Sequence, residues 1–384
     1  MSDPPVAKPS SPRLASLDAL RGFDLLMLTM VGPVLHVAAG RDLLPAGLVQ
    51  QFSHMPWQGF TCWDLVMPLF LFMAGVSIPV AFAKYVGEEA RLPKSRAYVR
   101  IARRVAVLWV LGCIAQGNLL ALDLAVLKPF SNTLQAIAVG YAGAALCYLW
   151  LGLGRQLLVA GGLLLAFWVA MRLGGDWTPA GNLAEKIDIA VFGKWHDGAS
   201  VDGGGIVRYS PHYHYTWILS SLNFIATVLS GVAAGSVLKS ARLGAGRKFL
   251  TLAGAGALAA AVGWLLDAFG VAPVIKPIWS SSMVLVSSGY STLLLAGFFA
   301  VTDWAGWKRW AGGLQVIGTN SIVAYMLSPE ANAISFASIT EPLLAGLKQW
   351  MEPGGHEVLV ASGNAVVLFL VLALLHRARV FLRP

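Results

Sequence analysis

Residues 60–83 read FTCWDLVMPLFLFMAGVSIPVAFA, an apolar run in which Asp64 is the single charged residue. At 1.5 Å per residue, a helix of this length crosses the ~30 Å hydrocarbon core of a bilayer. The stretch therefore predicts a membrane-spanning helix and directs attention to the one carboxylate it carries.

Similar apolar runs recur along the chain, which has 384 residues, 57% of them apolar and 12% charged. Because a soluble domain contains about 25% charged residues, this composition excludes a disordered chain, a collagen and an ordinary cytosolic enzyme. We predict an all-α integral membrane protein, a bundle of about ten transmembrane helices. The expected spans are 17–37, 60–83, 105–121, 133–151, 156–171, 215–238, 249–269, 280–302, 313–328 and 357–375, with 331–349 along the interface.

The positive charges alternate along the chain. Of the 28 Lys and Arg residues, 20 lie in the N-terminal segment with the foot of the first span, in 84–104, 152–155, 239–248 and 303–311, and at the C-terminus. Because cytoplasmic loops are enriched in Lys and Arg, we expect both termini in the cytoplasm of a plasma (bacterial inner) membrane. The same distribution explains the net charge of +9 without a nucleic-acid partner.

The chain divides into three predicted regions. Residues 1–16 are expected to form a disordered cytoplasmic tail, 17–376 the transmembrane domain, and 377–384 a cytoplasmic tail. The loop 172–214 is the best candidate for an outward lid or acceptor-binding element, because a loop of that length usually has a role or is disordered. Three cysteines provide neither a disulfide framework nor a metal site.

Polar residues within predicted spans are costly and therefore suggest function. On a helix, Asp18 and Arg21 are three apart and can pair, which anchors the start of the first span. Asp24 lies about 10 Å into that span and needs a partner or water. It is a candidate functional residue.

His54 precedes the second span and Asp64 lies about one turn inside it. A histidine with a carboxylate behind it is a ready general base. On these residues alone, a loop histidine at an aromatic belt with Trp57 explains the pattern better.

Two further segments carry polar groups. His212 and His214 are weak metal evidence, since no Cys or Glu completes a ligand set. Asn320 and Ser321 either bond neighbouring helices or hold a carbonyl or thioester. The chain has no P-loop, no Gly-rich dinucleotide turn and no serine-hydrolase elbow, so nucleotide hydrolysis is unsupported.

Several motifs resemble one family, the multi-spanning membrane acyltransferases related to heparan-alpha-glucosaminide N-acetyltransferase, and within it the bacterial domain-of-unknown-function branch with an R-G-F-D start. The resemblance covers essentially all the spans in order, and the block from His54 to Ser77 is its most specific part. The matching segments are 16–24, 54–77, 133–138, 227–235, 273–280 (P-x-x-K-x-x-W-S) and 318–325 (G-x-N-S-I).

The resemblance implies a reaction in which cytoplasmic acetyl-CoA donates an acetyl group to an amine or hydroxyl of a sugar on the outer face. It implies that His54 is the catalytic base or transient acyl carrier, with Asp64 as its supporting carboxylate. In this reading Asn320 stabilises the oxyanion. Residues expected to contact acyl-CoA phosphates are Arg21, Arg100, Arg103 and Arg104, and those expected on the acceptor side are Trp57, Lys276, Trp279 and His214.

The chain departs from the animal enzymes toward the acceptor side. It has Gly32 where they carry Asn, 215–218 in place of a D-P-E-G motif, and 328–330 in place of Gly-His-Glu. The acceptor, the acyl length, the kinetic order and the oligomeric state, a homodimer included, stay open. Alternatives are a secondary transporter or channel for a small polar solute, and an inactive relative that serves as a structural partner.

Overall fold

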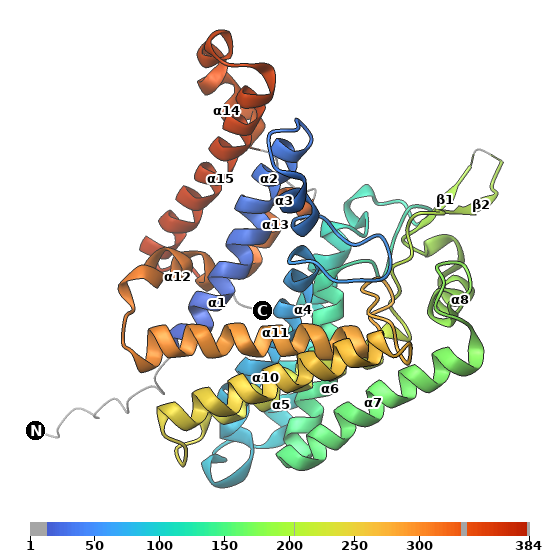
Figure 1. Cartoon of the computed structure of the whole chain (residues 1–384), viewed down its shortest axis with the longest axis vertical. Helices are drawn as coiled ribbons and strands as arrows, with labels where there is room; N and C mark the ends of the chain where they lie inside the picture. Colours follow the sequence, from blue (N-terminus) through green and yellow to red (C-terminus); the bar gives the residue numbers. More distant parts are fainter. Residues whose placement is uncertain (1–13, 203, 332–335, 382–384) are drawn as a thin grey trace, which may run out of the picture.

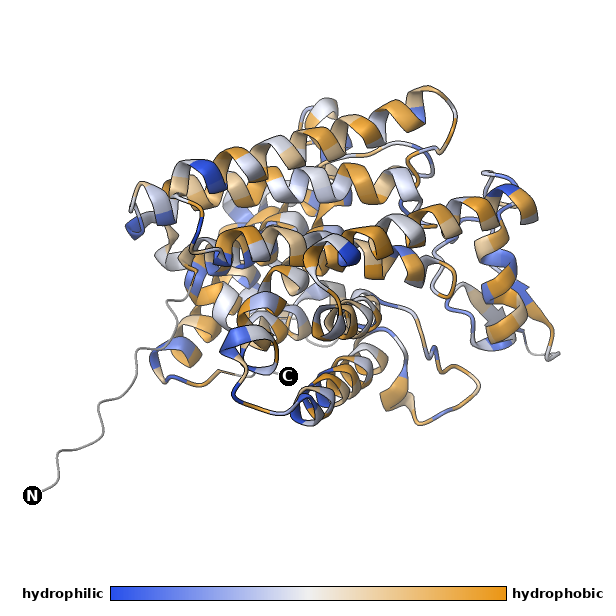
Figure 2. Cartoon of the chain, turned by 90° about the horizontal axis from the view of Figure 1, so that it is seen from below, coloured by the Kyte–Doolittle hydropathy of each residue, from blue (hydrophilic) through white to orange (hydrophobic). Residues whose placement is uncertain are grey.

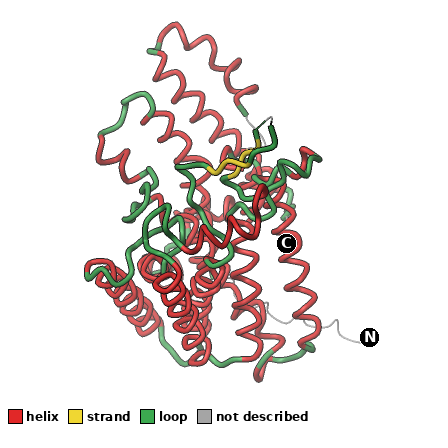
Figure 3. The backbone as a smooth tube through the Cα atoms, turned by 90° about the vertical axis from the view of Figure 1, so that its right-hand side faces the viewer, coloured by secondary structure: helices red, strands yellow, loops and turns green. Residues whose placement is uncertain are grey.

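A computed structural model describes residues 14–202, 204–331 and 336–381. This part of the chain is helical apart from one short hairpin, in which β1 (Ala199–Val201) pairs with β2 (Val207–Tyr209) in antiparallel fashion (Figure 3). The predicted all-α class is therefore observed with one small exception. The predicted disordered tail lies outside the described residues up to residue 13, and Ser16 already belongs to a helix.

The long helices form the body of the molecule (Figure 1). Their bounds are α1 Ala15–Leu26, α2 Gly32–Ala39, α4 Val66–Phe82, α5 Lys94–Ala115, α6 Thr133–Trp150, α7 Leu153–Gly174, α9 Ser220–Lys239, α10 Ala245–Ala268, α11 Ser281–Phe299 and α15 Pro353–Arg377. Shorter helices are α3 Ala46–Gln51, α8 Leu183–Phe192, α12 Gly312–Thr319, α13 Ser321–Met326 and α14 Ala337–Leu344. A π-turn, Met27–Val31, joins α1 to α2.

Eight helices among the described residues are long and apolar enough to cross a membrane. Apolar residues dominate these long helices (Figure 2). The protein is therefore an integral, multi-pass membrane protein. The eight candidate spans are Ala15–Ala39, Trp63–Tyr85, Thr133–Trp150, Leu153–Gly174, Ser220–Lys239, Ala245–Ala268, Ser281–Trp304 and Gly354–Arg377.

Two of the ten predicted spans differ from this set. The run predicted at 105–121 is the second half of α5, whose first half carries the basic residues of 94–104. The run predicted at 313–328 is broken at Asn320 into two helices of eight and six residues. The predicted interfacial segment contains α14 and the 3-10 helix Ala345–Trp350, while 332–335 lie outside the described residues.

Close backbone contact holds the centre of the bundle together. A Cβ added to Gly75 of α4 would collide with the Val228 carbonyl of α9, and one added to Gly231 of α9 would collide with the Phe72 carbonyl of α4. Small residues at such a crossing let two membrane helices pack without intervening side chains. Gly75 and Gly231 therefore fix α4, which carries Asp64 near its start, against α9.

The start of α1 and the end of α15 lie at the same end of the bundle. A Cβ on Gly318 of α12 would meet the Asp18 carbonyl of α1, and His376 of α15 lies 3.1 Å from the Thr319 hydroxyl. This arrangement is compatible with the predicted location of both termini on one side. The assignment of that side to the cytoplasm remains a prediction from charge.

Candidate functional site

His54 lies in the loop between α3 and the 3-10 turn Trp63–Leu65 that starts the α4 span. Its Nδ1 is 2.8 Å from Oδ1 of Asp64. The carboxylate is fully buried, whereas the histidine side chain keeps 47% of its surface exposed. An accessible imidazole is therefore hydrogen-bonded to a buried carboxylate, which is the arrangement that the family resemblance implies for this pair.

The second oxygen of Asp64 shapes the loop that carries His54. Oδ2 accepts hydrogen bonds from the backbone N–H of Thr61 at 3.1 Å, the hydroxyl of Thr61 at 3.0 Å and the backbone N–H of Met55 at 3.3 Å. Since Met55 directly follows His54, the same carboxylate orients the ring and clamps its backbone. Buried carboxylates are tolerated when all their lone pairs are satisfied in this way.

Lys276 completes the cluster from a distant part of the chain. Its Nζ lies 2.9 Å from His54 Nδ1 and 3.3 Å from Asp64 Oδ1, and its side chain is only 5% exposed. Backbone pairing positions the two segments, because the N–H of Gly59 donates to the carbonyl of Val274 at 2.9 Å. A lysine predicted on the acceptor side is thus a direct neighbour of the catalytic candidates.

The surroundings of His54 favour its neutral form. Partial burial lowers the pKa of His54 and the Lys276 ammonium lowers it further, while the hydrogen bond to Asp64 acts in the opposite direction. Nδ1 has room for one proton. If it donates to Asp64, Nε2 is left as the free acceptor on the exposed side of the ring. Such a ring can accept a proton near neutral pH or act as a nucleophile.

Aromatic side chains frame the site. The Trp63 ring lies 6.5 Å from the His54 ring and 5.1 Å from the His36 ring. Trp63 fits there because position 32 is glycine, and a Cβ at Gly32 would collide with the indole. The space that a side chain at position 32 would need is therefore filled by the Trp63 ring.

Two of the predicted acceptor-side residues lie together beside this loop. Trp57 and His214 stack edge to face with centroids 5.8 Å apart. His214 Nδ1 is 2.9 Å from Glu185 of α8, and the indole N–H of Trp57 donates to the Trp177 carbonyl. The long loop predicted as an acceptor element thus packs as ordered structure against the His54 segment, with α8 and the β1–β2 hairpin inside it.

Two other predicted residues are not brought to His54. Trp279 is 2% exposed, and its indole N–H donates to Thr227 at 3.1 Å. It is a core residue. Asn320 donates to the carbonyl of Val380 at 3.0 Å, next to the start of α1. It therefore lies at the opposite end of the bundle from Asp64, where it cannot stabilise an oxyanion at His54.

Three of the four predicted arginines line one cavity of about 430 Å³ at that opposite end. Arg21 comes from α1 and both Arg100 and Arg104 from α5, while Ser77 and Ala81 contribute from the far end of α4. Arg103 is exposed and is not among the residues described as lining the cavity. The sequence-predicted anion site is thus assembled from three helices, without Arg103.

Arg104 is prepared for an anion. Its guanidinium lies 4.2 Å from the centroid of the Tyr141 ring, and its buried Nε has no hydrogen-bond partner among the described residues. Arg100 donates to the Ala81 carbonyl at 3.2 Å, and Arg21 pairs with Asp18 at 3.6 Å. An unpartnered buried donor is costly, so a phosphate or other anion would stabilise Arg104.

The cavity and the histidine cluster lie toward opposite ends of α4. The α4 residue of the cavity nearest to Asp64 is Phe70, and six residues of helix separate them by ~9 Å. Among the described lining residues, none belongs to the His54 cluster. The arginine-lined cavity and the His54 cluster therefore lie at different positions along α4, with apolar side chains of that helix between them.

Asp24 remains outside both sites. It is 1% exposed in α1, and its Oδ2 has no hydrogen-bond partner within the described part of the chain. The sequence pointed to Asp24 because of its depth, but the structure gives it no catalytic neighbour.

Sequence reasoning missed the pairing of Lys276 with Asp64 and the clamp made by Thr61. A signal for the first was present, because Lys276 is the only charged residue in the apolar segment 271–279. A buried lysine nearly always has an acidic partner. The hydrogen bonds from Thr61 to Asp64 depend on the conformation of the loop, which the sequence does not reveal.

Comparison with known proteins finds two matches to this chain. Residues 13–132, which contain α1, His54, Asp64 and the three arginines, match a family described as Domain of unknown function (DUF5009). The chain is also 24% identical over 371 residues to heparan-alpha-glucosaminide N-acetyltransferase of Homo sapiens. The match covers 82% of this chain and 52% of that protein, so the chain spans about half the length of this curated relative. The resemblance expected from the motifs is confirmed as a distant similarity over most of the chain.

Proposed function

We propose that this protein is a membrane acyltransferase that moves an acetyl group from acetyl-CoA to an amine or hydroxyl of a sugar or glycan on the opposite face of the membrane. The single observation that carries the proposal is the exposed His54 held by Asp64 and Lys276 at one end of α4, with the arginine-lined cavity at the other end. The distant similarity to a named N-acetyltransferase supports the choice of reaction.

The donor binds through its phosphates to Arg21, Arg100 and Arg104. Arginine forms strong, charge-assisted hydrogen bonds with phosphate oxygens, and the buried Nε of Arg104 has no partner in the part of the chain that the structure describes. From this cavity the thioester arm must pass Phe70 to reach Asp64 and His54. The side of the bundle that holds the arginines is also the side that the charge pattern assigns to the cytoplasm, where acyl-CoA is expected.

In the direct route His54 is the general base. Nε2 removes the proton from the acceptor N–H or O–H as the acceptor atom attacks the thioester carbonyl. The C–S bond then breaks, and the imidazolium returns the proton to the CoA thiolate. Asp64 accepts from Nδ1–H and stabilises the transient imidazolium.

In the carrier route Nε2 attacks the thioester itself. CoA leaves as its thiolate and the acetyl group stays on the imidazole. The acceptor then attacks that acyl group, the bond from Nε2 to the carbonyl carbon breaks, and the acceptor proton passes to Nε2 and from there to the CoA thiolate. Both routes need the same tautomer, with the proton on Nδ1 facing Asp64. The two routes differ in whether an acetyl-enzyme forms without acceptor.

Replacement of His54 tests the proposal. His54→Ala should fold and bind acetyl-CoA but lose transfer by about 10²-fold or more. His212→Ala, an exposed histidine in the loop before α9, is the matched control and should retain activity. Radiolabel from acetyl-CoA trapped on wild type and absent from His54→Ala identifies the carrier route. Near-normal transfer by His54→Ala would refute the assignment.

A secondary transporter is the competing function, and acyl-CoA separates the two. A transporter moves solute without consuming acyl-CoA. If purified protein neither binds acetyl-CoA nor cleaves it with any amine or hydroxyl acceptor offered, while vesicles containing it take up a polar solute, the transporter explanation replaces the acyltransferase.

A further inference from the structure

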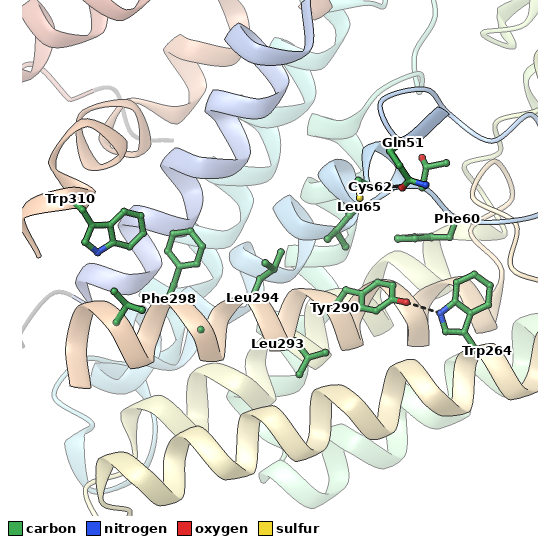
Figure 4. A pocket seen from close by; sticks show the side chains of 13 residues that line it. Gln51, Phe60, Cys62, Leu65, Trp264, Tyr290, Leu293, Leu294, Phe298 and Trp310 are labelled. Carbon is green, nitrogen blue, oxygen red and sulfur yellow. Dashed lines mark hydrogen bonds between the residues drawn. The ribbon is translucent and has the colours of Figure 1, made fainter. Parts of the chain in front are cut away.

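A groove of about 700 Å³ runs along α11, and none of its described lining residues belongs to the arginine cavity. It lies within the range of volumes typical of ligand sites. Its walls are mainly apolar, with Leu293, Leu294 and Phe298 along α11 and Trp310 at one end (Figure 4). From Tyr290 to Phe298 the groove follows ~12 Å of α11, which belongs to the candidate membrane span Ser281–Trp304.

The other end of the groove joins the histidine site. Phe60, Thr61 and Gln51 line it there. The Thr61 hydroxyl lies 3.0 Å from Asp64 Oδ2 and 2.8 Å from the carbonyl of Ser53, the residue before His54. Gln51 and Thr61 lie at this end, while the polar atoms of Trp264 and Tyr290 are hydrogen-bonded to each other at 2.9 Å. The groove therefore has a mainly apolar body and a polar end near the proposed base.

The floor of the groove is open. Gly297 is exposed, and a Cβ built on it would meet no atom within 4 Å. Glycine in the middle of a helix is destabilising relative to alanine, and at this position no neighbouring helix requires it. The space that a side chain would occupy belongs to the groove.

We propose that this groove holds the hydrocarbon tail of a lipid-anchored acyl acceptor, whose amine or hydroxyl head then lies at Thr61 next to His54. The inference rests on the proposed function and specifies its acceptor class. A hydrocarbon chain suits this groove, because its walls are mainly apolar and part of them belongs to a candidate membrane span. The acyl group of the proposed donor is a two-carbon acetyl, which is too short to fill a groove of about 700 Å³.

The test compares one sugar head with and without a tail. Wild type in nanodiscs is given acetyl-CoA with dodecyl glucosaminide or methyl glucosaminide. Each buried methylene favours binding by about fourfold, so kcat/KM should be at least about tenfold higher for the dodecyl compound. Gly297→Phe, which fills the groove, should remove most of this ratio. Gly161→Phe, on an exposed and open position of α7, is the control and should preserve it.

A binding measurement separates this inference from the proposed function. A dodecyl glucosaminide with a diazirine in its chain is photo-crosslinked without acetyl-CoA, and labelled peptides are mapped. Saturable labelling of the peptide around Phe298 that Gly297→Phe abolishes supports the groove even if no transfer is seen, in which case the acyltransferase assignment alone fails. Labelling that rises linearly with probe, as for bulk lipid, or that persists in Gly297→Phe, overturns the inference. An equal ratio in wild type and Gly297→Phe also overturns it.

Discussion

The ammonium nitrogen of Lys276 lies 3.3 Å from the fully buried carboxylate of Asp64, although the two residues come from opposite halves of the sequence. Because Nζ of Lys276 is also 2.9 Å from His54 Nδ1, the lysine affects the imidazole in two ways. It balances the charge of the acid that orients the ring, and its positive charge opposes protonation of the ring.

Removal of the lysine charge should alter the pH dependence of catalysis. Burial and Lys276 lower the pKa of His54 below the ordinary value for histidine. Because the base is active only when deprotonated, activity should rise as pH increases through this lowered pKa. In Lys276→Met that pKa should rise, and the acid limb of the kcat/KM profile should move to higher pH. The measurement is a pH–rate profile from pH 4.5 to 8.5.

Lys276→Arg retains the charge and serves as the control, with an acid limb close to that of wild type. Breaking a buried ion pair destabilises proteins by ~3–5 kcal/mol, so thermal unfolding of both variants is measured in parallel. An unchanged acid limb in folded Lys276→Met would contradict the electrostatic role of the lysine.

Gly32 should be intolerant of any side chain, since its space is occupied by the Trp63 indole. Gly32→Ala should lower stability by ~1–3 kcal/mol, the usual cost of overpacking. It should also reduce turnover by displacing the ring that faces His54. Thermal unfolding and steady-state kinetics in detergent measure both effects. Gly47→Ala, where a Cβ meets open space, should change neither.

A second substitution tests whether the clash is the cause. Trp63→Leu shortens the obstructing side chain, so the double variant Gly32→Ala/Trp63→Leu should be less destabilised by the added methyl than Gly32→Ala alone. Equal loss in both backgrounds would mean that Gly32 acts by some means other than making room for Trp63.

The sequence predicts the fold class from local information, whereas the His54–Asp64 pair is expected from the family resemblance, because on these residues alone a loop histidine at an aromatic belt explains the pattern better. A run such as 60–83 has to be a membrane helix, and ten positions separate His54 from Asp64 within one loop and one turn. Asn320 shows the limit of this approach. Its motif is polar and lies in a predicted span, but the helix is interrupted at Asn320. The position of α12 beside α1 depends on contacts between segments that are distant in the sequence.

The arginines show the same limit within a single helix. Arg103 and Arg104 are equivalent in composition, and the sequence assigns both to the donor. On α5 adjacent residues point about 100° apart, as 3.6 residues per turn dictate. Arg104 therefore lines the cavity while Arg103 is exposed. The packing of α5 against α6 decides which of the two arginines faces the proposed donor site, and the sequence does not give this packing.

The long loop should be less stable at neutral than at mildly acidic pH. Burial raises the pKa of Asp188 to about 7 and that of Asp197 to about 6. Both carboxyls therefore bind protons more tightly when folded than when unfolded, and their contribution to stability falls as pH rises from about 4 to about 7. Burial lowers the pKa of His196 to about 4, so the contribution of His196 to stability rises with pH. This single group opposes the two carboxyls and does not outweigh them.

Hydrogen exchange of the amides in 183–213, corrected for intrinsic rates, measures this dependence. The opening free energy should decrease from pH 5 to pH 7.5. Asp197→Asn, which keeps an acceptor for the Trp217 indole N–H, should flatten the decrease. An opening free energy that increases with pH would show that the histidine or an outside contact dominates.

Arg104 should bind the donor, and Arg103, its neighbour on the exposed face of α5, provides the sharpest comparison. Arg104→Ala should weaken acetyl-CoA binding by ~10-fold or more, because a hydrogen bond to a charged group contributes ~1.5–3 kcal/mol. Arg103→Ala should weaken it far less, by no more than the screened, long-range attraction of one exposed charge. Titration calorimetry at 50 and 300 mM salt measures both affinities.

The affinity of Arg104→Lys for acetyl-CoA should lie between those of wild type and Arg104→Ala, since an ammonium retains the charge but loses the planar, bidentate fork that suits phosphate. Equal effects of Arg103→Ala and Arg104→Ala would mean that the donor is attracted by the basic surface as a whole, and the cavity would then lose its assignment as the donor site.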